Sequence, residues 1–249
     1  NELSGVVIAT YPIRKYLTQN VASHIVGYTG KISSSEYKNK KELGYSQNDM
    51  IGKSGIEATF EEFLRGKNGK LRLEMDSEGR VTDKEETIES EMGNSVILTI
   101  DYDLQAKAEE VLEKYIKKIQ TGGFSETHSD ARAGALVVLD TKTSEVLALA
   151  SYPEYNPDEF TDGISVSEYK KYFDNEDRPM FNRAIQGTYS PGSTFKMVTA
   201  IAAIESGTIG VREQILTKGV YNQGHKPACW IWKGYRTTHG LVDAEKALK

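Results

Sequence analysis

The chain has 249 residues, of which 38% are apolar and 27% are charged, a composition typical of a globular protein long enough for two domains. A formal net charge of −5 argues against nucleic acid as the main partner, because binding phosphates requires a basic surface. No apolar run is long enough to cross a bilayer, and a single cysteine, Cys229, excludes an internal disulfide framework. The chain opens at Asn1 within a polar segment, without an initiator Met or signal peptide, so we expect it to be a piece of a longer protein.

The first 93 residues are polar and rich in glycine, which favours short strands joined by tight turns. Apolar residues at helical spacing predict a short helix over 57–64. Residues 70–81 are expected to form a hairpin with its turn at Ser77-Glu78-Gly79. The acidic stretch 82–93 has few apolar side chains and is expected to be a linker.

The remainder, residues 94–249, has a different character. Residues 96–100 form a β-branched run that predicts a strand, and Asp101 or Asp103 is expected to cap a helix that stops at Gly122-Gly123. The apolar stripe of that helix is Leu104, Ala108, Val111, Leu112, Tyr115, Ile116 and Ile119. Residues 134–140 and 145–151 predict a second hairpin. Residues 152–191 are expected to be a long functional loop whose prolines exclude a regular helix.

The last sixty residues begin with a predicted helix from Ser193 to about Ser206, stopped by Gly207, and end at the start of another helix over 243–248. Strands and helices therefore occur in both parts of the chain. The expected fold class is α+β, with an irregular, β-rich domain at 1–93 and a second domain at 94–249.

The segment Ser193-Thr194-Phe195-Lys196 contains the candidate catalytic residues, a serine nucleophile and a lysine base. A serine in the first turn of a helix lies near unpaired backbone N–H groups and the positive end of the helix dipole, which suits a developing alkoxide or oxyanion. Lys196 follows three residues later on the same face and can accept the Ser193 proton if its amine is neutral. Neutrality requires lowering a pKa of about 10.4 by about three, at a cost of about 4 kcal/mol, through desolvation and a neighbouring cation. S-x-x-K by itself is a weak signal, and its place after Pro191-Gly192 at the end of a long loop is what strengthens it.

Other motifs have simpler explanations. The glycine spacing before Ser193 resembles a phosphate-binding loop, but serine stands where that motif requires lysine. His225, Cys229 and His239 are too scattered to indicate a metal site, so no metal or cofactor is expected. Trp230 and Trp232 alternate as in a strand and favour packing over sugar binding.

The sequence resembles the class B high-molecular-mass penicillin-binding proteins. The resemblance rests on Ser190-Pro191-Gly192-Ser193-Thr194-Phe195-Lys196, and on collinear segments across nearly the whole chain. In the second domain these are 96–105, 134–153 and 156–160. In the first they are Tyr11-Pro12, 24–30, 51–57 and 79–81, which resemble the family's non-catalytic pedestal, a dimerisation-like domain.

This resemblance implies a serine-type D,D-transpeptidase of peptidoglycan synthesis with a penicillin-binding-protein/β-lactamase-like catalytic domain. Ser193 corresponds to the nucleophile that D-Ala-D-Ala stem peptides and β-lactams acylate, and Lys196 to its base. The implied partners are stem peptides on lipid-linked precursor strands, β-lactam antibiotics and, through the pedestal, other cell-wall synthesis proteins. The implied location is the extracytoplasmic face of the bacterial cytoplasmic membrane, where such proteins are membrane-anchored antibiotic targets that help determine cell shape.

The family has two further motifs, S-x-N and K-[ST]-G, downstream of the serine. Here Ser46-Gln47-Asn48 and Lys53-Ser54-Gly55 spell them upstream, in the wrong domain, and we interpret both as coincidences. The 249 residues are therefore expected to be an inactive fragment, truncated before these motifs. A non-catalytic cell-wall interaction module, and a serine β-lactamase or β-lactam sensor, remain as alternatives.

Overall fold

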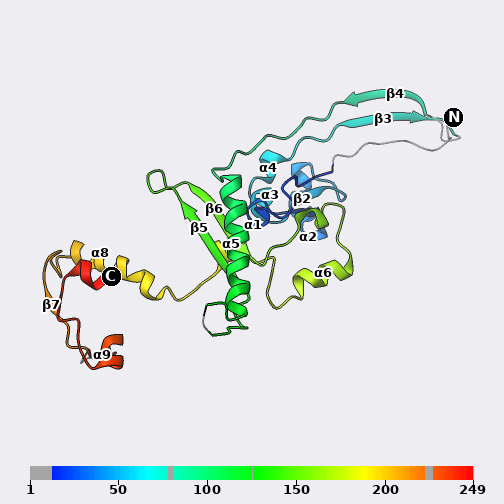
Figure 1. The fold of residues 1–249 in the computed structure, drawn as a ribbon. Helices are drawn as coiled ribbons and strands as arrows, with labels where there is room; N and C mark the ends of the chain where they lie inside the picture. The colour runs from blue at the N-terminus through cyan, green and yellow to red at the C-terminus, as the bar shows by residue number, and fades with distance from the viewer. Residues whose placement is uncertain (1–12, 78–80, 125, 222–226, 249) are drawn as a thin grey trace. The chain divides into compact units, whose positions relative to one another are not determined.

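The computed structural model describes residues 13–77, 81–124, 126–221 and 227–248 (Figure 1). By its internal contacts the chain divides into two compact units, residues 1–187 and residues 188–249, and each is described by itself. The Tyr11-Pro12 segment of the family resemblance lies outside the described residues. The division at 187/188 differs from the domain boundary expected near residue 93, which stays a prediction.

The first unit mixes helices with two-stranded antiparallel sheets, in agreement with the α+β class. Its helices are α1 (Ser23–Val26), α2 (Ser34–Lys40), α3 (Gly55–Thr59), α4 (Glu61–Leu64), α5 (Tyr102–Gln120), α6 (Val166–Phe173) and α7 (Arg183–Gln186), with 3-10 turns η1 (Lys41–Leu43) and η2 (Pro157–Phe160). Its strands pair as β1 (Thr29–Lys31) with β2 (Met50–Gly52), β3 (Lys70–Met75) with β4 (Val81–Ile88), and β5 (Gly134–Leu139) with β6 (Val146–Tyr152).

The first region of this unit has its own small apolar core, made of Ile32, Tyr45 and Ile51. The helix predicted over 57–64 forms as α3 and α4, because Phe60 leaves the helical conformation with φ −109° and ψ 21° between them. The predicted single helix is thus two short helices with Phe60 between them.

The hairpin predicted over 70–81 forms from β3 and β4, and residues 78–79 of its expected turn lie outside the described residues. The linker predicted at 82–93 is wrong for most of its length, because β4 continues to Ile88. Beyond it, Lys67 and Glu91 pair through their backbones and through an ion pair of 2.7 Å. Strand pairing uses backbone groups, so a polar segment can form a strand without an apolar face.

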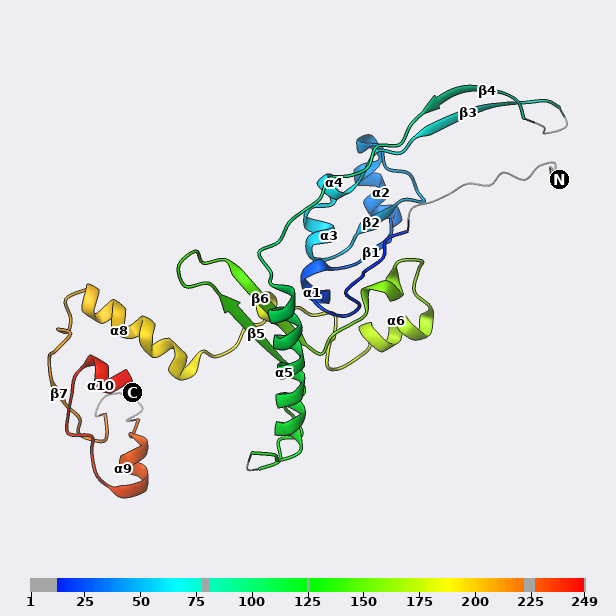
Figure 2. The same ribbon diagram turned by 45° about the horizontal axis from the view of Figure 1, so that its top comes forward.

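The long helix α5 packs against the β5–β6 hairpin, as Figures 1 and 2 show. Asp101 caps the helix by accepting a hydrogen bond of 2.9 Å from the Leu104 N–H, as predicted. The packing centres on Ala108 from α5 and on Ala148 and Ala150 from β6. Of the predicted apolar stripe, Ala108 and Ile116 are buried, whereas Leu104 and Tyr115 are exposed.

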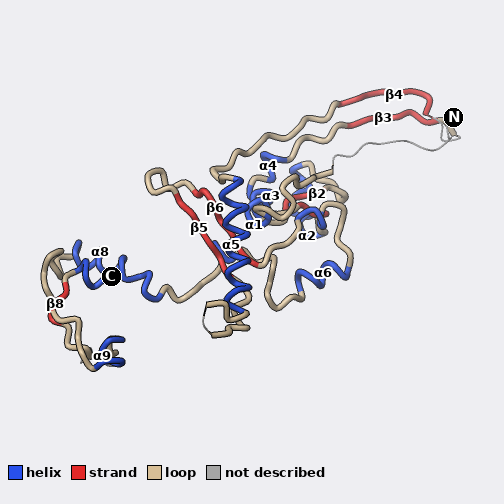
Figure 3. Tube along the Cα trace, in the orientation of Figure 1, coloured by secondary structure: helices blue, strands red, loops and turns tan. Residues whose placement is uncertain are grey.

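The strand predicted at 96–100 does not form. Figure 3 draws the chain between β4 and α5 as a loop. The segment approaches β6 only near its end, where Thr99 Oγ1 donates to the Val146 carbonyl (2.7 Å) and the Asp101 N–H to the Leu147 carbonyl (3.0 Å). Ile97 is 95% exposed, so its β-branched side chain has no surface to pack on.

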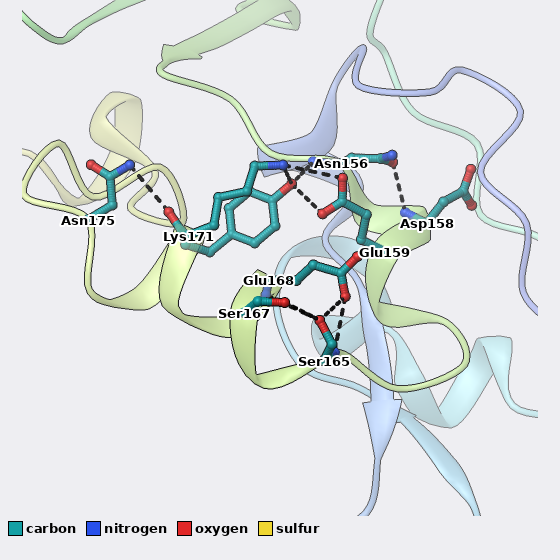
Figure 4. A network of polar contacts seen from close by, with 9 residues as sticks. Asn156, Asp158, Glu159, Ser165, Ser167, Glu168, Lys171 and Asn175 are labelled. Atoms are coloured by element: carbon teal, nitrogen blue, oxygen red, sulfur yellow. Dashed lines mark hydrogen bonds and ion pairs between the residues drawn. The ribbon is translucent and has the colours of Figure 1, made fainter.

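The segment predicted as a helix-free loop, 152–191, contains η2, α6 and α7. Its prolines lie outside α6, and a capping box starts that helix. The Ser165 hydroxyl accepts from the Glu168 N–H (3.2 Å), and the Ser165 N–H donates to the Glu168 carboxylate (3.1 Å; Figure 4). Lys171, on the same helix, lies 3.5 Å from the Glu159 carboxylate. The segment therefore has its own ordered structure.

The second unit contains η3 (Gly192–Phe195), α8 (Lys196–Glu205), β7 (Ile215–Leu216), α9 (Trp230–Tyr235), β8 (Leu241–Val242) and α10 (Ala244–Leu248). β7 pairs with β8 in antiparallel fashion. The helices predicted from Ser193 and over 243–248 both form. The alternating strand predicted for Trp230 and Trp232 is wrong, because both residues lie in α9. Within the described parts of the chain, no helix combines the length and the apolarity needed to cross a membrane.

Candidate active site

The helical segment that carries Ser193 starts with a sharp turn. Gly192 has φ +55°, a left-handed conformation that favours glycine. Thr194 holds the turn closed, because its hydroxyl donates to the Pro191 carbonyl at 2.5 Å and its N–H to the same oxygen at 3.3 Å. The chain thus passes directly from Pro191-Gly192 into η3 and then into α8.

Ser193 and Lys196 lie one turn apart. The Lys196 N–H donates to the Ser193 carbonyl, which closes a 3-10 turn. Because a 3-10 helix has three residues per turn, side chains three residues apart project in the same direction. Both residues are exposed. The hydroxyl and the amine are therefore carried on the same side of a helix start, open to a substrate.

Lys196 also borders an apolar groove of about 390 Å³ between the start of α8 and α10. The groove is lined by Gly192, Phe195, Lys196, Thr199, Ala200, Ala203, Ile209, Ala244, Ala247 and Leu248. Lys196 is the charged residue of this set.

The two motif-like triplets upstream of Ser193, Ser46-Gln47-Asn48 and Lys53-Ser54-Gly55, have structural roles in the first unit. The Ser46 hydroxyl donates to Asp49 Oδ1 at 2.5 Å, and Lys53 Nζ donates to Glu36 Oε2 at 2.6 Å. Ser54 is the residue before α3. Gly55 has φ +58°, and an added Cβ there would lie 2.4 Å from the Ile25 carbonyl oxygen. These local contacts give Ser46, Lys53 and Gly55 structural roles within the first unit.

The scattered His and Cys residues do not form a site within the described residues. His225 lies outside them, Cys229 is half-buried, and His239 makes an edge contact with Trp230. In the described part of the chain, no group of three or more His, Cys, Asp or Glu side chains could hold a metal ion.

A set of buried polar residues that the sequence did not reveal joins the region before β3 to the segment after β6. His24, Asn182 and Arg183 are 7%, 8% and 7% exposed. No local signal in the sequence marks these residues, because contact across more than 150 residues is not visible in a sequence pattern.

Two family descriptions match the chain. Residues 1–98 match the family described as "Penicillin-binding Protein dimerisation domain", and residues 134–249 match the "Penicillin binding protein transpeptidase domain". Ser193 and Lys196 lie in the second of these matches.

Curated relatives and solved structures agree with these matches. The chain is 33% identical over 245 residues to the peptidoglycan D,D-transpeptidase MrdA of Acinetobacter baumannii, covering 98% of this chain and 34% of the relative. It matches the crystal structure of Pseudomonas aeruginosa PBP2 in complex with WCK 5153 with a TM-score of 0.73 and 32% identity, covering 94% of this chain and 44% of that one. A complex between PBP2 and MreC from Helicobacter pylori also gives a TM-score of 0.73, with 30% identity and coverage of 94% and 40%.

The chain spans about a third of the length of the curated relatives it matches. The two family matches occur in the same order as the two regions distinguished in the sequence, and together they extend over most of the chain. The chain belongs to the penicillin-binding proteins that combine a dimerisation domain with a transpeptidase domain.

Proposed function

We propose that the protein containing this chain is a peptidoglycan D,D-transpeptidase, with Ser193 as nucleophile and Lys196 as the base that activates it. The observation that carries the proposal is the Lys196–Ser193 turn within the segment that matches the transpeptidase family. Residues 1–93 serve as the pedestal, and residues 94–249 form the first part of the catalytic domain.

The reaction proceeds through an acyl-enzyme. Ser193 Oγ attacks the carbonyl carbon of the penultimate D-Ala while its proton passes to the neutral Lys196 amine. Backbone N–H groups at the helix start favour the negative oxygen of the tetrahedral intermediate. When the intermediate collapses, the C–N bond breaks and the terminal D-Ala leaves with the proton from Lys196. An amine of a neighbouring strand then attacks the ester, forming a new peptide bond and restoring the Ser193 hydroxyl. A β-lactam enters the same first step, and its opened ring stays attached to the serine.

The proposed location and partners follow the same reasoning. The relatives' names support work on peptidoglycan, and therefore on the outer side of the cytoplasmic membrane. The Helicobacter PBP2 structure is a complex with MreC, which supports a protein partner for the protein that contains this chain, and we propose the pedestal as its binding region.

The test is covalent labelling of the full-length protein by a fluorescent penicillin, followed by mass spectrometry of the peptide that contains Ser193. We expect one adduct per protein on Ser193, none in Ser193→Ala, and acylation at least about a hundredfold slower in Lys196→Met. Labelling that persists in Ser193→Ala would contradict the assignment. Rapid hydrolysis of the adduct would instead indicate a serine β-lactamase, and folded protein without any adduct would indicate a non-catalytic module.

A further inference from the structure

The short helix α1 is fixed within the first region by its flanking backbone. Ala22 has φ +61° before it, and Gly27 has φ +82° after it. A Cβ on Gly27 would lie 1.9 Å from the Ser54 carbonyl oxygen, so the two backbones are in close contact. These conformations leave α1 little freedom to shift.

Buried polar contacts connect α1 to the segment after β6. The Tyr155 hydroxyl donates to the Ser23 carbonyl at 2.8 Å. His24 Nε2 lies 2.7 Å from the Pro179 carbonyl oxygen, and because a carbonyl only accepts, the histidine Nε2–H is the donor. Ser23 and His24 are 0% and 7% exposed, so water does not replace these bonds when they are lost.

Asn182 connects α1 to α7. Its Nδ2 donates to the His24 carbonyl at 3.3 Å, while its Oδ1 caps α7 by accepting from the Ala184 N–H at 3.2 Å. Next to it, the Arg183 N–H donates to Ser151 Oγ of β6 at 3.0 Å. The start of α7 is therefore fixed by α1 on one side and by β6 on the other.

The position of α7 matters because the proposed nucleophile comes soon after it in the chain. α7 ends at Gln186, and Ser193 comes seven residues later. We propose that α1 is a positioning element for the transpeptidase reaction, in which His24 and Asn182 together fix the segment that leads into the nucleophile. The inference rests on the proposed function, and it assigns α1, in the region that matches the dimerisation domain, a role in the rate of Ser193 acylation.

The protonation state of His24 fits this role. Burial lowers the pKa of its imidazole, and the Arg183 guanidinium lowers it further, against the raising effect of the bond to Pro179. The Tyr155 ring packs edge-on against the imidazole. The ring is therefore neutral at neutral pH and donates from Nε2.

The experiment measures the rate of acylation of the full-length protein by a fluorescent penicillin, together with the melting temperature of each variant. In His24→Leu the Pro179 carbonyl loses its donor, and acylation is expected to slow by about tenfold to a hundredfold. His24→Gln supplies an amide donor and is expected to restore the rate to within about threefold of wild type.

Asn182→Asp separates the two roles of that residue. Aspartate keeps the cap on α7 but cannot donate to the His24 carbonyl, so acylation is expected to slow although α7 remains capped. Ile51→Val is the matched control, because it weakens the core of Ile32, Tyr45 and Ile51, which contains no residue of α1. It is expected to lower the melting temperature while leaving the acylation rate unchanged.

Wild-type acylation rates in folded His24→Leu and Asn182→Asp would overturn the inference, and so would equal slowing in Ile51→Val. If His24→Leu does not fold, Asn182→Asp and the His24→Gln rescue decide the question. Ser193→Ala separates this result from the proposed function: labelling that persists in that variant defeats the nucleophile assignment, whatever the other variants do.

Discussion

Gln105 is a fully buried polar residue of α5, and its amide bonds the backbone of β6 at two points. Its Nε2 donates to the Leu149 carbonyl at 3.0 Å, and its Oε1 accepts from the Leu149 N–H at 2.7 Å. The same Nε2 donates to Glu109 at 2.7 Å. One side chain thus satisfies both backbone groups of a residue in the sheet.

Gln105→Met is expected to lower the free energy of unfolding by about 3 kcal/mol, because it leaves both Leu149 groups buried without a partner. Chemical denaturation measures the change. The control is Lys107→Met on the exposed side of the same helix, which should stay within about 0.5 kcal/mol of wild type. Equal stability of the two variants would contradict the role given to Gln105.

Glu154 is expected to make the stability of the folded protein depend on pH near neutrality. Burial raises the pKa of its carboxyl to about 7, with further contributions from Glu109 and Glu113. The folded-state pKa lies above the unfolded value of 4.5, so the native carboxyl keeps a proton that the unfolded chain releases. Stability from this group is therefore present below pH 4.5 and is lost as the pH rises through 7.

Glu154→Gln removes the charge and should be more stable than wild type by about 1–2 kcal/mol at pH 8, after allowance for partial exposure of the group. Near pH 4 the two proteins should be equally stable. Thermal unfolding of both across this range tests the prediction, and a constant difference at all pH values would contradict it.

At the scale of elements, α5 and β6 approach closely because small side chains lie between them. Ala148 and Ala150 are both 0% exposed and pack with Ala108. Leu136 and Val138 of β5 complete this cluster. Closely packed interiors tolerate added volume poorly.

Ala150→Leu is expected to destabilise the protein by about 2 kcal/mol, because the added methyl groups must displace α5. Ala135→Leu makes the same change on the exposed side of β5 and should have little effect. Urea unfolding of both variants decides whether the alanines set the distance between helix and sheet.

At the scale of the whole molecule, many apolar side chains of the second unit are exposed. α8 has no buried residue within the described chain, and Phe195, Val198 and Ile201 are 51%, 52% and 62% exposed. An apolar helix normally requires a surface to pack on. The sequence from Met197 to Lys249 also contains neither S-x-N nor K-[ST]-G.

A protein of these 249 residues alone is therefore expected to react with a fluorescent penicillin at least about a hundredfold more slowly than the full-length protein, because its sequence after Lys196 contains neither of the two further motifs of the family. Gel fluorescence over time, with Ser193→Ala as background, measures both rates. Rapid labelling of one equivalent by the short protein would show that Ser193 needs neither motif.

Local signals in the sequence were sufficient for several features. Asp101 as a cap, the β5–β6 hairpin and the helix that begins near Ser193 were all predicted, because capping, alternation and glycine stops act over a few residues. Ser193 and Lys196 were found in the same way, since their relation spans one helical turn. Their catalytic roles stay a proposal.

Other features of the fold depend on the tertiary contacts that each segment makes. Residues 96–100 have strand-forming side chains but contact β6 only at their end, and the polar 82–88 forms a strand because β3 supplies a backbone partner. His24, Gln105 and Asn182 have no local signature, because their partners lie 155, 44 and 158 residues away. The sequence by itself determined the fold class, the order of the two regions and the Ser193–Lys196 pair, since these follow from short-range periodicity and motif order. The tertiary structure alone decided which polar groups are buried together, because that depends on contacts that chain distance does not constrain.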